Sequence, residues 1–204
     1  GMLVLGSLVA PSFLASCTSP EATKAAGIAF GMNHFKVSES DLKKVLAAAL
    51  EKGGDYADLF FEHTLNNGIQ LQDGAVNNAQ SNIDFGMGVR VLSGDQTGYA
   101  YVENITLDEM LKAARTAARI ADSNNTNKNV AALTEVKPKG SYYDVQAPWE
   151  SFTVKDKMPY LQKLNDKIFA LDKRVHKVRA FLSDSTSHIF FCNTEGQMLS
   201  LIHI

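Results

Sequence analysis

The chain has 204 residues and a formal net charge of −2, with 20 basic and 22 acidic side chains. This length suits one domain with a real hydrophobic core, and the balanced charge excludes a disordered tail and a strongly basic nucleic-acid binder. Because only two cysteines are present, a disulfide-stapled small protein and a four-cysteine zinc site are excluded too. We therefore expect a globular domain with no nucleic-acid partner.

The first 16 residues are predicted to be a truncated lipoprotein signal peptide. Residues 2–15 carry no charge, yet they are too few for a membrane-spanning helix, which needs roughly 20 apolar residues. The segment Leu14–Cys17 (LASC) is similar to a bacterial lipobox, which predicts lipidation of Cys17 and a protein anchored on the periplasmic side of the cell envelope. No basic residue precedes Lys24, so we expect native sequence upstream of Gly1. The alternative is a buried apolar segment with an incidental cysteine.

Three further regions follow the signal peptide. We expect a polar linker over residues 17–37, a folded domain over 38–198 and a non-native tail over 199–204. The tail sequence LSLIHI is identical to a translated transposon-end adapter of sequencing libraries, so we expect the native protein to continue past about Met198. The alternative is a short native strand.

Apolar periodicity predicts three helices in the domain. The first contains Leu42–Leu50, with Ser38 or Ser40 as its N-cap. The second begins at the capping box of Thr106 and runs to about residue 122. The third begins at Asp156, which places Pro159 in the first turn, where proline is tolerated.

The remaining apolar segments read as short strands separated by turns, with turns expected at 66–68 and 184–187 and a long surface connection over 123–149. Short connections favour antiparallel hairpins, and each helix has one apolar stripe to bury. We therefore predict an α+β fold with a mainly antiparallel sheet covered on one face by helices. The predicted strands are Asp58–Thr64, Ile69–Gln72, Phe85–Leu92, Thr97–Val102, Val175–Leu182 and Ile189–Cys192.

The hairpin over residues 85–102 has an unusual number of small residues. Gly86, Gly88 and Arg90 share one face of their strand, and Gly98 is a bare position on the neighbouring strand. Glycines in a strand allow another backbone to approach closely. The favoured interpretation is tight packing of a helix on the sheet. The alternative is a groove for an extended peptide or a second domain, with the Arg90 guanidinium as a donor at its edge.

No catalytic or metal-ligating residue is predicted. None of the five histidines begins a metallohydrolase helix motif, and the chain has no complete dinucleotide or phosphate-binding loop. His63 is expected to be a half-exposed sheet residue rather than a ligand, and Cys192 a buried small hydrophobe.

The central block nevertheless resembles a known family. The ordered segments are Asp55–Glu62 (DYADLFFE), Gln72–Gly74 (QDG), Phe85–Val91 (FGMGVRV) and Gly94–Tyr101 (GDQTGYAY), followed by the helix from Thr106. They closely resemble the N-terminal domain of the TldD/PmbA family, also known as modulators of DNA gyrase, and the resemblance covers about residues 38–196.

This resemblance implies a function that the composition does not show. TldD-type members are zinc metalloproteases that cut unfolded or extended peptides together with a PmbA-type (TldE) partner. Their metal-binding His-Glu-x-x-x-His helix lies in a C-terminal domain, so the resemblance places zinc outside this chain and implies no catalytic residue within it. Family members are otherwise cytoplasmic, which distinguishes them from the predicted lipoprotein.

Three functional hypotheses remain open. The leading one is the substrate-framing and dimerising N-terminal domain of a truncated, exported TldD-like zinc metallopeptidase, inactive as the present chain. It would pair with itself or with a PmbA/TldE-like subunit. The second is a non-catalytic PmbA/TldE-type partner, and the third is a stand-alone lipoprotein binding module.

Overall fold

The computed structural model describes residues 27–121, 129–136 and 147–203. Within these residues, six strands form one sheet in the order β3-β2-β1-β5-β6-β4, and every neighbouring pair is antiparallel except β4 and β6. The strands are β1 (Tyr56–Gln72), β2 (Ala75–Ser93), β3 (Gln96–Val102), β4 (Thr134–Glu135), β5 (Arg179–Asn193) and β6 (Gln197–His203). The helices are α1 (Ile28–Phe35), α2 (Glu39–Ala49), α3 (Leu107–Ile120), the 3₁₀ helix η2 (Trp149–Ser151) and α4 (Val154–Leu171).

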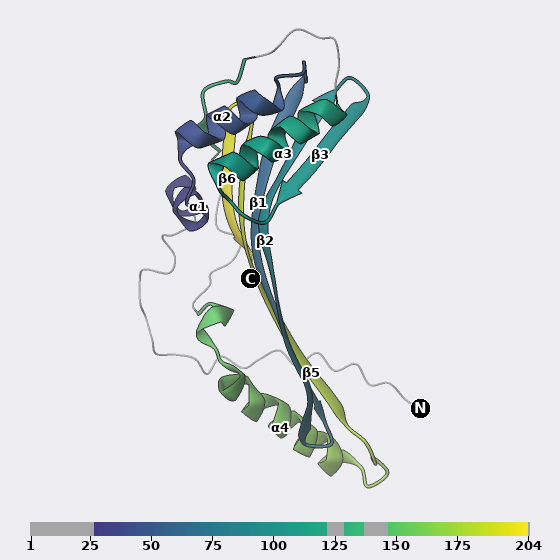
Figure 1. The fold of residues 1–204 in the computed structure, drawn as a ribbon. Helices are drawn as coiled ribbons and strands as arrows, with labels where there is room; N and C mark the ends of the chain where they lie inside the picture. Colours follow the sequence, from purple (N-terminus) through teal and green to yellow (C-terminus); the bar gives the residue numbers. More distant parts are fainter. Residues whose placement is uncertain (1–26, 122–128, 137–146, 204) are drawn as a thin grey trace.

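The molecule is elongated because three of its strands are much longer than the others (Figure 1). At one end, which we call the head, all the strands lie beside one another and α1, α2 and α3 pack on them (Figure 1). Beyond the head, β1, β2 and β5 continue as a three-stranded ribbon to the far end, where α4 lies (Figure 1).

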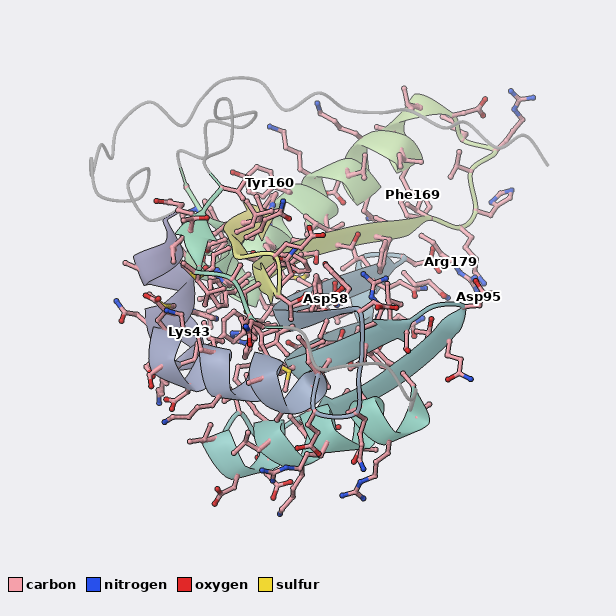
Figure 2. All side chains as sticks on the ribbon, turned by 90° about the horizontal axis from the view of Figure 1, so that it is seen from above. Lys43, Asp58, Asp95, Tyr160, Phe169 and Arg179 are labelled. Carbon is pink, nitrogen blue, oxygen red and sulfur yellow. The ribbon has the colours of Figure 1, made fainter. Side chains whose placement is uncertain are left out.

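All the described helices lie on one face of the sheet. Side chains alternate between the two faces along a strand, and the residues of β1 that contact helices, from Ala57 to Leu71, occupy odd-numbered positions. Viewed from above, α2 and α3 form a layer along this face (Figure 2). The predicted α+β fold, with a mainly antiparallel sheet and helices on one face, is therefore confirmed.

The head contains the larger hydrophobic core. The apolar stripe of α2 buries Leu42, Val45 and Leu46 completely, against sheet residues such as Phe61 and Phe190. Both predicted N-caps are present: the Ser38 hydroxyl accepts a hydrogen bond from the Asp41 backbone N–H, and Thr106 caps α3 in the same way. Capping and apolar periodicity thus predicted the starts of these two helices.

A second, smaller core lies at the far end of the ribbon. Leu161 of α4 packs there on Ile69, Leu71 and Ala180 of the sheet. Thr153 and Asp156 form a capping box, so α4 begins at Val154, two residues before the predicted start. The core is small, and its few residues make the polar contacts of α4 important for holding the helix in place.

Two predicted turns are wrong. Residues 66–68 lie inside β1 and residues 184–187 inside β5, where both segments pair with each other in register. Residue types that favour turns are tolerated in these strands because the ribbon buries few side chains. Their polar groups form hydrogen bonds with side chains of the neighbouring strand. For example, the Asn67 side-chain amide donates to the Asp184 carboxylate at 2.9 Å, and Ser185 donates to Asn66 at 2.8 Å.

The ends of the described chain also differ from expectation. Residues 28–35 of the expected linker form α1, whose Ile28 and Phe35 join the head core. Residues 199–203 form most of β6 and pair with β5, as the strand alternative expected, while the non-native origin of this tail stays a prediction. The 123–149 connection is described only in part, and Cys17 lies outside the described residues. No helix in the described ranges is long and apolar enough to cross a membrane.

Candidate functional site: the open face of the sheet

The face of the sheet opposite the helices is uncovered in the head, as far as the structure describes the chain. We call it the open face. It presents large side chains to solvent: Phe60 is 39% exposed, Tyr99 58% and Tyr101 69%. Aromatic rings at this exposure mark a surface suited to binding a partner or ligand. The residues that alternation places on the open face of the head include Tyr56, Asp58, Phe60, Glu62, Gly86, Gly88, Arg90, Tyr99, Tyr101, Phe191 and Asn193.

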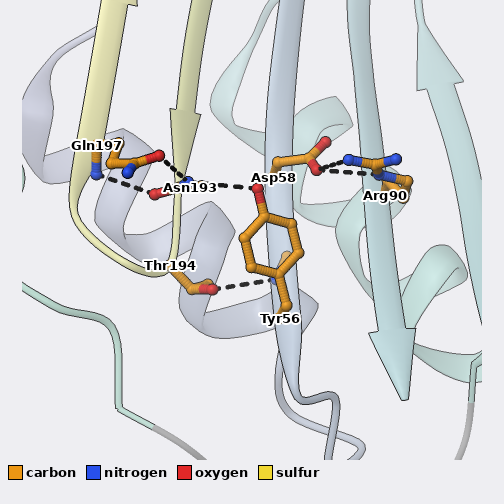
Figure 3. Close-up of polar contacts among 7 residues, drawn as sticks. Tyr56, Asp58, Arg90, Asn193, Thr194 and Gln197 are labelled. Carbon is orange, nitrogen blue, oxygen red and sulfur yellow. Dashed lines mark hydrogen bonds and ion pairs between the residues drawn. The ribbon is translucent and has the colours of Figure 1, made fainter. Parts of the chain in front are cut away.

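A polar network holds one end of the open face rigid (Figure 3). Arg90 of β2 donates from Nε and Nη2 to Asp58 Oδ2 of β1, at 3.0 and 2.5 Å. On the other side, the Asn193 amide donates to the Tyr56 hydroxyl and to Gln197 (Figure 3). Hydrogen bonding to Asp58 raises the pKa of Arg90, and burial raises the pKa of Tyr56. The guanidinium that the groove interpretation offered as a donor is therefore already paired with Asp58.

The predicted groove glycines divide between the two faces. Gly86 and Gly88 lie on the open face, but their space is used by the chain itself: a Cβ would come 2.5 Å from the Val102 carbonyl oxygen or 2.6 Å from the Tyr99 hydroxyl, respectively. Gly98 faces the helices instead, and its Cβ would overlap the Ala117 carbonyl oxygen of α3. The structure thus brings Gly86, Gly88 and Arg90 together on the open face. Gly98 lies on the other face, where its missing side chain allows α3 to pack closely on β3.

A pocket of about 490 Å³ lies beside these glycines, where β3 ends. Its aromatic lining includes Phe60, Tyr99 and Tyr101. Its acidic lining consists of Glu62, Asp84 and Glu103. The pocket therefore combines flat apolar surfaces with negative charge.

A histidine cluster lies on the opposite, helix-bearing face of the sheet. His34 Nε2 of α1 is 2.8 Å from His63 Nδ1 of β1, and the His34 ring stacks on His188 of β5 with centroids 4.4 Å apart. His188 Nε2 is 3.1 Å from a Glu150 carboxylate oxygen of η2. Burial lowers the pKa of both His34 and His63, and the nearby charge of His188 lowers them further. His63 is half-buried, as predicted, but its position in this cluster was not foreseen.

The cluster should make the protein sensitive to acid. Because the pKa values of His34 and His63 are lower in the folded state, the unfolded chain takes up protons first. Their contribution to stability is therefore complete above the ordinary histidine pKa of about 6.5 and is lost as pH falls below it. Urea unfolding should show a lower free energy of unfolding at pH 5.5 than at pH 7.5.

The variants His63→Phe and His176→Gln test the source of this effect. His63→Phe should reduce the difference between the two pH values, whereas His176→Gln should leave it unchanged, because His176 is exposed on the connection after α4. A wild-type protein that is equally stable at both pH values would contradict the prediction.

Cys192 is inaccessible in the head core, as predicted. The residue is fully buried, and desolvation raises the pKa of its thiol to about 12. Since the thiolate is the reactive form, Cys192 should not react with a thiol reagent such as DTNB in the native state. A Cys17→Ser variant isolates this thiol: we expect no colour before denaturation and one equivalent after it. Rapid labelling of the native variant would show that the core opens readily.

The described residues do not fit a metal centre. Within the described ranges, no group of three or more His, Cys, Asp or Glu side chains, the histidine cluster included, is arranged to hold an ion.

Sequence reasoning missed the two features that depend on spatial assembly. The histidine cluster joins residues 34, 63 and 188, which are far apart in the chain and carry no motif spacing. The acidic pocket likewise joins three separate segments. One signal was available for the pocket. In the register of β1 and β2, Glu62 pairs with Gly86, which is two residues from Asp84. Side chains two residues apart in a strand share a face, so Glu62 and Asp84 could be placed on the same face once this register was known.

Comparison with known proteins identifies the domain. Residues 57–121 match the family described as PmbA/TldA metallopeptidase domain 1. The chain is 32% identical over 144 residues to the metalloprotease TldD homolog of Buchnera aphidicola from Schizaphis graminum. It is 33% identical over 145 residues to the homolog of Haemophilus influenzae. Each match covers 71% of this chain but only 29% and 30% of the relative, respectively.

Solved structures share the fold at lower identity. A protein from Thermotoga maritima, described as a modulator of a DNA gyrase, superposes with a TM-score of 0.59 at 18% identity and covers 80% of this chain and 37% of its own. TldE from Thermococcus kodakarensis superposes with a TM-score of 0.55 at 16% identity and covers 79% and 36%. These two likenesses show the fold alone.

The sequence matches and the shared fold agree on one assignment. The chain spans about a third of the length of the curated relatives it matches, and the family match covers the segment from β1 to the end of α3. The chain therefore belongs to the TldD/PmbA family, of which it contains the N-terminal domain.

Proposed function

We propose that this chain is the substrate-framing and dimerising domain of a TldD-like zinc metallopeptidase that acts on extended peptides. The observation that carries the proposal is the sequence identity of 28–33% to metalloprotease TldD homologs. In this proposal the zinc site lies in a further domain, because the metal-binding His-Glu-x-x-x-His helix of TldD-type members belongs to their C-terminal domain. The domain contributes a rigid sheet whose open face aligns the peptide.

The geometry of the open face supports this role. An enzyme that acts on unfolded chains needs a surface that accepts extended backbone and diverse side chains, and exposed aromatic rings beside a strand edge provide one. The Arg90–Asp58 ion pair and the Asn193 contacts fix the strands beneath it, so the surface is preorganised.

The runner-up is a PmbA/TldE-type subunit that binds without catalysing. The fold of TldE from Thermococcus kodakarensis supports it, because the same domain shape occurs there. In either case we propose pairing with a second subunit, either a copy of itself or a TldE-like partner.

The decisive experiment uses the contiguous genomic gene. An open reading frame that continues into a His-Glu-x-x-x-His segment, together with one zinc per catalytic subunit and cleavage of an unfolded peptide, would support the peptidase. Changing the motif glutamate to glutamine should abolish cleavage and leave zinc in place. A reading frame without this segment would remove the peptidase proposal, and a purified protein with near-zero zinc would favour the TldE-type subunit. The 204-residue chain itself should show no cleavage with or without added zinc.

We also propose that the protein is exported and anchored through Cys17. The support is the LASC sequence followed by a polar segment. Metabolic labelling with a fatty-acid analogue and detergent phase partition should place the wild type in the membrane fraction, and Cys17→Ser should release it. Membrane partition that is unchanged in the variant would rule out the anchor.

A further inference from the structure

The edge of β2 is open where β3 ends. The ladder between the two strands stops at Met87 and Val102, and along residues 75–86 no described strand pairs with the outer edge of β2. Apolar side chains stand on this edge: Val76 is 51% exposed and Ile83 63%. A long free edge with exposed apolar residues is a ready template for pairing with another extended chain.

The place where β3 ends and β2 continues alone forms a step in the sheet, beginning beyond Met87 and Val102. The pocket of the open face lies at this step. Ile83 and Gly88 line it from β2, and Val102 closes one side from the end of β3. The Val102 carbonyl lies above Gly86, where only a glycine leaves enough room. An extended segment that continues the line of β3 along β2 would therefore pass directly over the pocket and could direct a side chain into it.

The charges around the pocket select the kind of side chain. Glu62, Asp84 and Glu103 contribute three carboxylates, and within the described part of the chain none of the three forms an ion pair. Arg90, which lies on the same face, is already paired with Asp58. The exposed rings of Tyr99 and Tyr101 add surfaces that favour a cation through their π electrons. A lysine or arginine side chain satisfies both features, whereas a carboxylate is repelled.

We propose that this step binds an extended polypeptide segment that pairs with the free edge of β2 and places a lysine or arginine side chain in the pocket. This inference rests on the proposed function in one respect, namely that the open face binds peptides. It adds that the pocket prefers a basic side chain of the bound peptide. The polar network beyond the pocket stays structural and takes no part in the selection.

The test measures binding of fluorescent decapeptides to the 204-residue chain by anisotropy at low salt. Three peptides differ only at a central lysine, glutamine or glutamate, and a fourth carries the lysine with N-methyl groups on alternate backbone amides. We expect the lysine peptide to bind about tenfold more tightly than the glutamine peptide and the glutamate peptide to bind most weakly. The N-methylated peptide should lose binding, because it cannot complete the ladder. Equal affinity for lysine and glutamate, or full affinity of the N-methylated peptide, would overturn the proposal.

Matched variants locate the binding site. The triple variant Glu62→Gln, Asp84→Asn and Glu103→Gln should abolish the preference for lysine, and Glu62→Gln keeps an acceptor for the Thr64 hydroxyl. The control makes the same change in net charge at exposed positions on the helices and the β5–β6 turn. It combines Glu39→Gln, Asp166→Asn and Glu195→Gln, and it should retain the preference. A preference that survives the first triple variant would overturn the site.

The two proposals can fail separately. A contiguous gene product without zinc or cleavage overturns the peptidase and leaves lysine-selective binding standing. Equal binding of all the peptides overturns the pocket assignment and leaves zinc-dependent cleavage standing.

Discussion

Replacing Gly98 by alanine should lower the free energy of unfolding by about 2–3 kcal/mol, a typical cost of forcing extra atoms into a packed core. A Cβ at this position would overlap the Ala117 carbonyl oxygen and reach within 3.0 Å of the Ala121 backbone nitrogen. Both obstacles belong to the backbone of α3, so no side-chain rotation relieves the clash. Urea unfolding of the wild type and variant at pH 7.5 measures the loss.

Gly88→Ala is the matched control for this prediction. It makes the same chemical change on the neighbouring strand, but the nearest obstacle there is the Tyr99 hydroxyl at 2.6 Å. Tyr99 is 58% exposed and can turn toward solvent, so we expect a loss below about 1 kcal/mol. Equal losses in the two variants would show that α3 moves away from β3 as easily as a tyrosine ring does.

The glycines illustrate what sequence reasoning can and cannot separate. Strand alternation placed Gly86, Gly88 and Arg90 on one face correctly, because that assignment depends only on parity within one strand. The face of Gly98 depends on the register between β2 and β3, in which Gly98 pairs with the buried Val91. Without this register, packing and groove interpretations of Gly98 could not be told apart.

The starts of α2 and α3 were predictable because their signals are local. Ser38 and Thr106 act as N-caps through hydrogen bonds that span three residues. The lengths of the strands were not predictable from local signals. Asn66 and Ser185 are residue types that favour turns, yet they lie inside strands of the ribbon and form a hydrogen bond with each other. Their conformation follows from pairing with a distant segment of chain, which a local pattern does not contain.

The lengths of these strands explain why the molecule has two separate cores. A ribbon of three strands carries the sheet well beyond α2 and α3, and its middle is covered on neither face by a long helix in the described part of the chain (Figure 1). The far end is therefore stabilised almost independently, by α4 and the few apolar residues beneath it. An interaction that fixes α4 has a large local effect and a small effect on the head.

Lys157→Met should detach α4 from the ribbon. The Lys157 ammonium lies 2.6 Å from an Asp184 carboxylate oxygen, and their side chains are only 6% and 1% exposed. Removing the lysine leaves a buried carboxylate without its cation, which costs about 3–5 kcal/mol. The small core under α4 cannot offset that cost, so we expect the helix to open. Hydrogen exchange should accelerate for amides of α4 and stay unchanged for those of α3.

Two further variants separate the charge from the packing at this site. Adding Asp184→Asn to Lys157→Met removes the unpaired charge and keeps an acceptor for the Asn67 amide, so protection of α4 should return in large part. Arg174→Met breaks an ion pair whose arginine is 90% exposed, and it should leave the exchange of α4 unchanged because solvent screens such pairs. If the double variant exchanges as fast as Lys157→Met, packing of the lysine stem holds α4, and the buried charge is not the cause.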